Sequence, residues 1–182
     1  TNAAGTVYTV KLKEGVQWHD GALLTAKDVE FTINLIKNPE TRSSLRVNWQ
    51  DVKVKAVDDY TIQFELPAVY ASFPNALTFA VLPQHLLKDV APGAIRENTF
   101  SQSPVGSGPF SFRLLQSADE KKHRIVQMSA FEKYYNGKPM LNRFEVHAYS
   151  SQEEIVKALR SGEVTAAGDL AGINTLQIDK AN

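Results

Sequence analysis

The chain has 182 residues, no cysteine, and equal numbers of basic and acidic side chains, 20 of each. This balance gives no support for a nucleic acid or an acidic membrane surface as a partner. The lack of cysteine excludes disulfides, thiolate nucleophiles and cysteine metal sites. A chain of this length can bury a real core in one large domain or in two small ones.

The first part of the chain predicts a strand followed by a long helix. Apolar and polar side chains alternate over Tyr8–Lys13, which indicates a strand with one buried face. After a turn at Asp20 and Gly21, Thr25 is typical of a helix N-cap, with Asp28 in the reciprocal position. The helix is expected to end at Asn38, because Pro39 follows.

A hairpin and two short helices are expected next. Alternation over residues 52–56 and 60–66, on either side of Asp58 and Asp59, predicts the hairpin. Residues 71–88 predict two short helices that flank an extended piece. The polar stretch 98–103 suggests a boundary between a domain at 1–103 and a second at 104–182.

The second domain predicts strands at 110–115, 124–128 and 144–148. A helix should then begin after Ser151, with Glu154 in the capping position, and end at Gly162. Residues 164–167 are typical of a short buried strand. Strand, helix and strand in succession predict a parallel pair.

Four sequence blocks in a fixed order carry a more specific signal. They are Tyr8–Gly21 with Thr25–Val29, Val105–Phe110, Tyr134–Pro139 and Ala158–Val164. Together they resemble the signature of the peptide/nickel (family 5) solute-binding proteins of ABC importers. The resemblance covers nearly the whole chain, and it implies an α/β fold of the type II periplasmic-binding-protein kind. This chain would hold a small α+β subdomain and part of the main mixed-sheet lobe of a longer protein.

The resemblance also implies a function. The longer protein would capture a small solute, with an oligopeptide or dipeptide as the favoured cargo, outside the cytoplasmic membrane and deliver it to a membrane permease. Such proteins are secreted, commonly with a lipid anchor, and close two lobes on the ligand by a hinge motion. With the distal lobe outside these residues, this chain alone should bind weakly or not at all. Its open sheet edges could pair two copies.

Residues that could contact a ligand are sought among aromatic side chains and loops. The candidates are Arg42, Trp49, Phe79, Ser107, Gly108 and Tyr149. For Trp49, packing on the hairpin is the favoured alternative. Tyr149 ends a strand beside a helix N-terminus, where parallel sheets commonly bind ligands. Where the family usually has aspartate after Gly-Glu-Val, this chain has Thr165, and Asp169 lies at a different position, so a role based on that aspartate does not transfer.

Catalysis and metal binding find little support. Ser107 lies between two glycines, yet Val105 and Pro109 occupy the outer positions that a Gly-x-Ser-x-Gly elbow needs as glycine. The four histidines are scattered without metal-ligand spacing, so no metal, cofactor or catalytic residue is predicted. Two alternatives stay open. A hydrolase would gather Ser107 with a histidine and an acid, or two facing carboxylates, in one pocket. A sensory or scaffold module would keep the fold without a ligand-sized cleft.

Overall fold

A computed structural model describes residues 1–2, 4–117 and 124–168. The chain forms two compact units. Unit 1 comprises Thr1–Ser111 and Ala130–Met140, and unit 2 comprises Phe112–Ser129 and Leu141–Asn182. Sequence analysis placed the boundary after residue 103. That boundary stays a prediction, and the loop at 105–109, which follows it, is hydrogen-bonded to His19 of unit 1.

Unit 1 contains a three-stranded antiparallel sheet. Its order is β1 (Val7–Lys11), β3 (Thr61–Glu65) and β2 (Lys53–Ala56). Tyr8 and Val54 both lie opposite Phe64, so these three side chains share one face. The predicted first strand and hairpin are confirmed.

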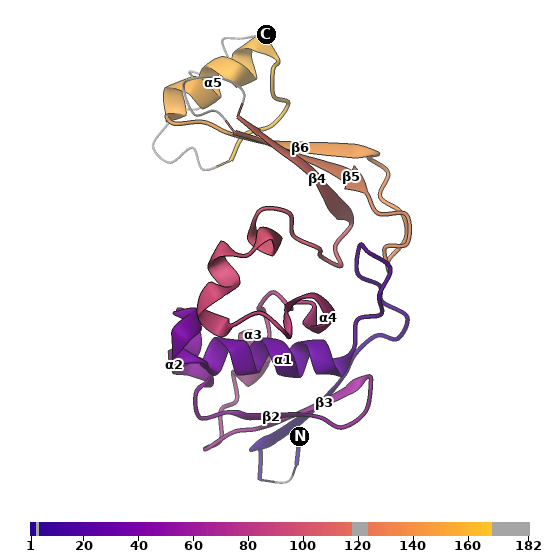
Figure 1. Ribbon diagram of the computed structural model, residues 1–182, viewed down its shortest axis with the longest axis vertical. Coiled ribbons are helices and arrows are strands. Elements are labelled where there is room, and N and C mark those ends of the chain that lie inside the picture. Colours follow the sequence, from indigo (N-terminus) through magenta and orange to yellow (C-terminus); the bar gives the residue numbers. More distant parts are fainter. Residues whose placement is uncertain (3, 118–123, 169–182) are drawn as a thin grey trace. The chain divides into compact units, whose positions relative to one another are not determined.

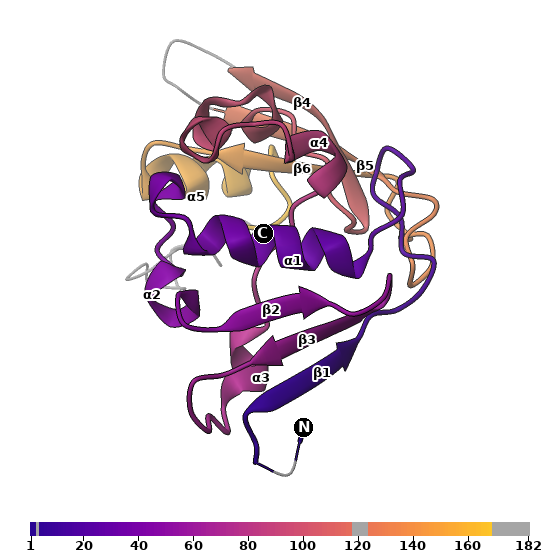
Figure 2. The same cartoon turned by 60° about the horizontal axis from the view of Figure 1, so that its bottom comes forward.

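Helix α1 (Ala26–Lys37) runs along this sheet face (Figures 1 and 2). The Thr25 N–H donates to the Asp28 carboxylate at 2.8 Å, and the helix stops at Asn38 before Pro39, as predicted. Its buried face is made of residues at helical spacing, namely Ala26, Val29, Ile33 and Ile36. The apolar core of unit 1 therefore lies between α1 and the sheet.

Four aromatic rings complete this core. Trp49, at the end of α2 (Arg46–Trp49), is 2% exposed and lies against Phe64, Phe73 and Phe79, with ring centroids 5.9, 5.7 and 5.2 Å away. Phe73 opens α3 (Phe73–Ala76). The shorter elements are α4 (Gln84–Leu87) and 3-10 turns at Pro39–Thr41, Pro92–Glu97 and Thr99–Ser101. Helices α3 and α4 confirm the two short helices predicted in 71–88.

Buried polar groups attach the segment before α4 to α1. Asp28, 4% exposed, accepts from the Gln84 N–H at 2.8 Å as well as from Thr25. One turn on, the Thr32 hydroxyl accepts from the Leu82 N–H at 2.8 Å. Each buried oxygen satisfies a backbone amide, as burial requires.

Unit 2 contains a second three-stranded sheet, ordered β4 (Phe110–Ser117), β5 (Arg124–Ala130) and β6 (Arg143–Ala148). Strands β5 and β6 are antiparallel, with Val126 opposite Val146. Helix α5 (Gln152–Ser161) follows. The Ser151 hydroxyl caps it by accepting from the Glu154 N–H, and Gly162 ends it with φ 74°. The three strands and this helix are confirmed.

The predicted strand at 164–167, and with it the parallel pair, is wrong. Residues 164–168 form no strand, and the described partner of β6 is the antiparallel β5. The N–H groups of Glu163 and Val164 both donate to the Ala158 carbonyl, at 2.9 and 3.3 Å, so they close the end of α5. Asp169 lies outside the described residues. Within the described ranges, no helix combines the length and apolar character needed to span a membrane.

Candidate functional site

The six candidate binding residues occupy separate places in the two units. Ser107 and Gly108 lie in a loop of unit 1, and Tyr149 lines a hollow of unit 2. Trp49 and Phe79 are brought together, but inside the unit 1 core. The packing alternative therefore accounts for Trp49, and Phe79 is half-buried beside it.

Arg42 lies at an exposed turn after α1. Its backbone is left-handed, with φ 51°, and its carbonyl accepts from the Arg96 guanidinium at 2.8 Å. The neighbouring Arg46 guanidinium donates to the Lys37 carbonyl at the end of α1. These contacts shape the turn and close the C-terminal end of the helix.

The loop of Ser107 is held by His19. The His19 N–H donates to the Gly106 carbonyl at 2.8 Å, and the Gly106 N–H donates to His19 Nδ1 at 3.2 Å. Since Nδ1 accepts, the neutral ring carries its proton on Nε2, which lies 3.0 Å from the Gly108 carbonyl and donates to it. The ring also meets the edge of Phe131, with centroids 4.9 Å apart. We name these contacts the His19 clamp.

The clamp fits glycine at position 106. A Cβ there would lie 3.3 Å from His19 Cε1, whereas a Cβ at Gly108 would meet nothing within 4 Å. Both ring nitrogens of His19 bind backbone groups, so the imidazole is not placed as a general base for the Ser107 hydroxyl.

The adjacent acidic pairs, Asp58 with Asp59 and Glu153 with Glu154, likewise serve local structure. Asp58 accepts from the Tyr60 N–H, and Asp59 lies 3.4 Å from Lys27. In the second pair, Glu154 accepts from the backbone and hydroxyl of Ser150 at the start of α5. These contacts belong to a turn and a helix N-terminus.

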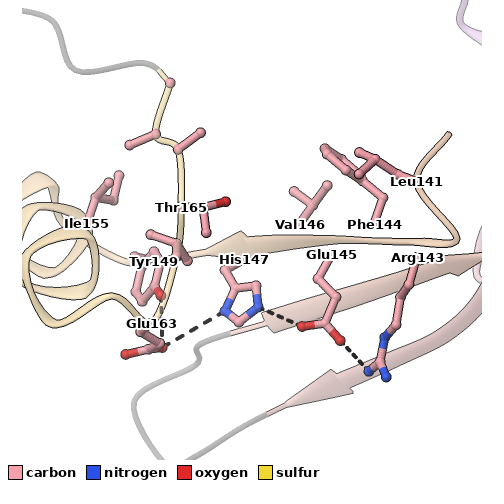
Figure 3. Close-up of a pocket in the computed structure, with 14 residues that line it drawn as sticks. Leu141, Arg143, Phe144, Glu145, Val146, His147, Tyr149, Ile155, Glu163 and Thr165 are labelled. Carbon is pink, nitrogen blue, oxygen red and sulfur yellow. Dashed lines mark hydrogen bonds and ion pairs between the residues drawn. The ribbon is translucent and has the colours of Figure 1, made fainter.

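Unit 2 contains a hollow of about 720 Å³ beside β6, which we call the β6 hollow. Its apolar lining includes Leu141, Phe144, Val146 and Ile155, and residues 163–168 form another part of its wall. Figure 3 shows Phe144 and Val146 on one side of β6 and a row of polar side chains on the other. The hollow therefore joins an apolar surface to a polar border.

The polar border is a connected chain of charged and hydrogen-bonding groups. Arg143, Glu145 and His147 alternate along β6 and share one side of it (Figure 3). The Arg143 guanidinium donates to Glu145, whose other oxygen lies 3.3 Å from His147 Nε2. His147 Nδ1 is 3.9 Å from the Glu163 carboxylate, which accepts from the Tyr149 hydroxyl at 2.9 Å.

These contacts set the protonation of two groups. Burial, and then the hydrogen bond to Glu163, raise the pKa of Tyr149 to about 12. The hydrogen bond with His147, followed by that with Arg143, holds the pKa of Glu145 below its ordinary value. At neutral pH, Tyr149 is therefore a neutral donor held by an acceptor, and Glu145 is ionised.

Sequence analysis selected Tyr149 but missed Glu145, His147 and Glu163. A signal existed, because the apolar alternation of 144, 146 and 148 implies a complementary polar face at 143, 145 and 147. The place of Glu163 depends on how α5 ends. Over the ranges that the structure describes, no group of three or more histidine and carboxylate side chains is arranged to hold a metal ion.

Comparison with known proteins identifies the family. Residues 1–182 match the bacterial extracellular solute-binding proteins, family 5 Middle. The oligopeptide-binding protein AppA of Bacillus subtilis is 32% identical over 164 residues, which cover 88% of this chain and 29% of AppA. The chain thus spans less than a third of that relative.

Solved structures agree with this match. The ABC transporter substrate-binding protein CtaP of Listeria monocytogenes is 37% identical, with a TM-score of 0.79 over 90% of this chain and 33% of its own. NikZ of Campylobacter jejuni, solved with Ni(L-His), is 30% identical with the same TM-score, over 90% of this chain and 32% of its own. These relatives are transport binding proteins rather than enzymes. The chain therefore belongs to the bacterial extracellular solute-binding proteins of family 5, and its two small sheets form part of a type II periplasmic-binding-protein fold.

Proposed function

We propose that this chain is part of a longer substrate-binding component of an ABC importer, which captures an oligopeptide or dipeptide outside the cytoplasmic membrane and delivers it to a permease. The observation that carries the proposal is the family match over residues 1–182, joined to the 32% identity with a protein named for oligopeptide binding. Peptide is favoured over other cargo because both AppA of Bacillus subtilis, at 32% identity, and a putative peptide-binding protein of Brucella ovis, at 31%, are named for peptides.

The chain alone should bind such a ligand weakly. It spans 29–33% of the relatives described above, so most of the polypeptide that could contact a ligand lies outside it. A binding site gains affinity from contacts that surround the ligand, and pockets commonly bury most of a small ligand's surface. Affinity is therefore a property of the longer protein.

Within this chain, Ser107 and Gly108 in unit 1 and Tyr149 in unit 2 are the proposed ligand contacts, each on the grounds of its own surroundings. The Ser107 loop offers a hydroxyl that can both donate and accept. Tyr149 offers an aromatic face, because its hydroxyl is already held by Glu163. Arg42 and Phe79 are weaker candidates, since one shapes an exposed turn and the other packs beside Trp49.

Two further features belong to the same proposal. The longer protein carries a lipid anchor that keeps it at the outer face of the membrane. The chain by itself pairs with a second copy through an open sheet edge, because an unpaired edge strand presents backbone donors and acceptors to another chain. Among the described residues, β6 is the last strand in the order of its sheet, which supports this pairing.

Titration calorimetry of the longer protein tests the function. It would be performed with a mixed pool of two- to five-residue peptides, with free amino acids, and with Ni²⁺ plus L-histidine as the competing cargo. The proposal expects heat from the peptide pool and none from the other two. Heat from Ni²⁺ plus L-histidine alone would replace the peptide assignment, and an absence of heat from all three would overturn the binding function.

A further inference from the structure

The His19 clamp binds the residues on both sides of Ser107 but not Ser107 itself. Its three hydrogen bonds use the N–H and carbonyl of Gly106 and the carbonyl of Gly108. None of these three bonds uses the hydroxyl or the N–H of Ser107, a described residue. The clamp therefore fixes the loop backbone and leaves the Ser107 donors for another molecule.

His19 itself lies in a turn that is held by backbone hydrogen bonds. The Trp18 N–H donates to the Ala22 carbonyl at 2.8 Å, and the Gly21 N–H donates to the Trp18 carbonyl at 2.9 Å. Trp18, next to His19, is 1% exposed. The histidine thus reaches the loop from a turn that hydrogen bonds and burial already hold.

An aromatic contact supports the imidazole as well. Phe131 packs against the imidazole, and its own N–H donates to the Pro109 carbonyl at 2.8 Å. The segment 105–109 is thereby held at Gly106, Gly108 and Pro109, with Ser107 between the fixed points. Such preorganisation lowers the entropy that a loop loses when it binds a ligand.

We infer that His19, as the neutral Nε2–H tautomer, is a positioning residue that presents Ser107 to the ligand. The consequence for ligand affinity rests on the proposed binding function. The structural part does not, because the clamp lies wholly within unit 1 of this chain.

Two substitutions separate the hydrogen bonds of the two ring nitrogens. His19→Asn places an amide oxygen near Nδ1 and keeps the acceptor for Gly106, whereas His19→Gln places an amide nitrogen near Nε2 and keeps the donor to Gly108. His19→Phe keeps the ring contact with Phe131 and removes both bonds. His147→Asn is the matched control, because His147 lies in unit 2 and takes no part in the clamp.

The first measurement is NMR on this chain. Imidazole nitrogen shifts should report the Nε2–H tautomer for His19. Amide hydrogen exchange at Gly106 should quicken by about fivefold to tenfold in H19Q and H19F, since one hydrogen bond is lost, but not in H19N or H147N. An Nδ1–H tautomer, or equal Gly106 exchange in all variants, would overturn the clamp.

The second measurement is a double-mutant cycle on peptide affinity in the longer protein. Ser107→Ala and His19→Phe should each weaken peptide binding by about threefold to tenfold. The double variant should lose no more affinity than the more strongly affected single variant, because both substitutions remove the same contact. Losses that multiply would show that His19 acts independently of Ser107 and would overturn the inference. A wild-type protein that binds no peptide would overturn the proposed function, and the exchange pattern at Gly106 would then decide the clamp alone.

Discussion

His19 and Gly106 are hydrogen-bonded to each other twice, backbone to backbone at 2.8 Å and backbone to imidazole at 3.2 Å. The two residues are 87 positions apart in the sequence. The pair joins the turn before α1 to the loop that leads into β4. Glycine at position 106 allows this approach, because a side chain would meet the ring.

Gly106→Ala should therefore destabilise unit 1, by about 1–2 kcal/mol, because the imidazole must move to admit the new methyl group. Gly108→Ala is the matched control. Its Cβ meets nothing within 4 Å, so its effect should be close to zero or slightly stabilising. Urea unfolding followed by tryptophan fluorescence suits this comparison, since both tryptophans, Trp18 and Trp49, lie in unit 1. Equal stability of the two variants would contradict the close contact.

Trp49→Ala should be among the most damaging single substitutions in unit 1. The ring is 2% exposed and packs on three phenylalanines, so its loss should cost about 3–5 kcal/mol. Phe79→Ala, at the half-buried margin of the same cluster, should cost less. Circular dichroism during urea unfolding measures both variants. A loss of under 1 kcal/mol for Trp49→Ala, on the scale of an exposed substitution, would mean that Trp49 is not a core residue.

Asp28→Ala should cost about 2–4 kcal/mol, because it leaves the N–H groups of Thr25 and Gln84 without their acceptors in a buried place. Asp59→Ala is the control. It breaks only an exposed ion pair with Lys27, which is worth about 0–1 kcal/mol. Both free energies of unfolding come from urea titrations. Equal effects of the two substitutions would show that Asp28 does not connect α1 to the segment before α4.

Tyr149 should lose its proton at a higher pH than an ordinary tyrosine. Its pKa of about 12 in the folded chain exceeds the ordinary value of 10, so the stabilisation linked to its proton is fully present below pH 10 and is lost as the pH rises toward 12. The tyrosinate absorbance of the wild type minus that of Tyr149→Phe isolates this residue. Glu163→Gln should lower the pKa of Tyr149 only in part, because burial is the larger cause.

A control for that titration lies on α5. Glu153 is exposed and is not among the groups that shift Tyr149, so Glu153→Gln should leave the pKa of Tyr149 unchanged. If Glu163→Gln were equally without effect, the hydrogen bond between Tyr149 and Glu163 would not form in solution.

Sequence reasoning succeeded where the signal is local. The cap at Thr25 with Asp28, the stop at Asn38 and the alternation around Asp58 depend on neighbouring residues, and α1 and the β2–β3 hairpin appear as expected. The prediction of the second strand in the parallel pair was wrong because strand pairing depends on residues that are far apart in the sequence. Residues 164–167 have strand-like composition, but Glu163 and Val164 are used to close α5.

The candidate site residues also divide into those that local sequence predicts and those that depend on contacts between distant residues. Trp49 could be a ligand wall or a core residue by sequence, and only the positions of Phe64, Phe73 and Phe79 in space decide that it packs. The His19 clamp could not be predicted, because nothing in residues 15–25 indicates contact with 105–109. The polar border of the β6 hollow was partly readable from its alternation along β6.

Native mass spectrometry of the longer protein, purified from its own host without refolding, tests the central claim most directly. The account predicts a co-purified mass, released on denaturation, that fragments as a short peptide. A protein that emerges empty, and whose melting temperature neither a peptide library nor metal ions raise, would contradict the proposed function.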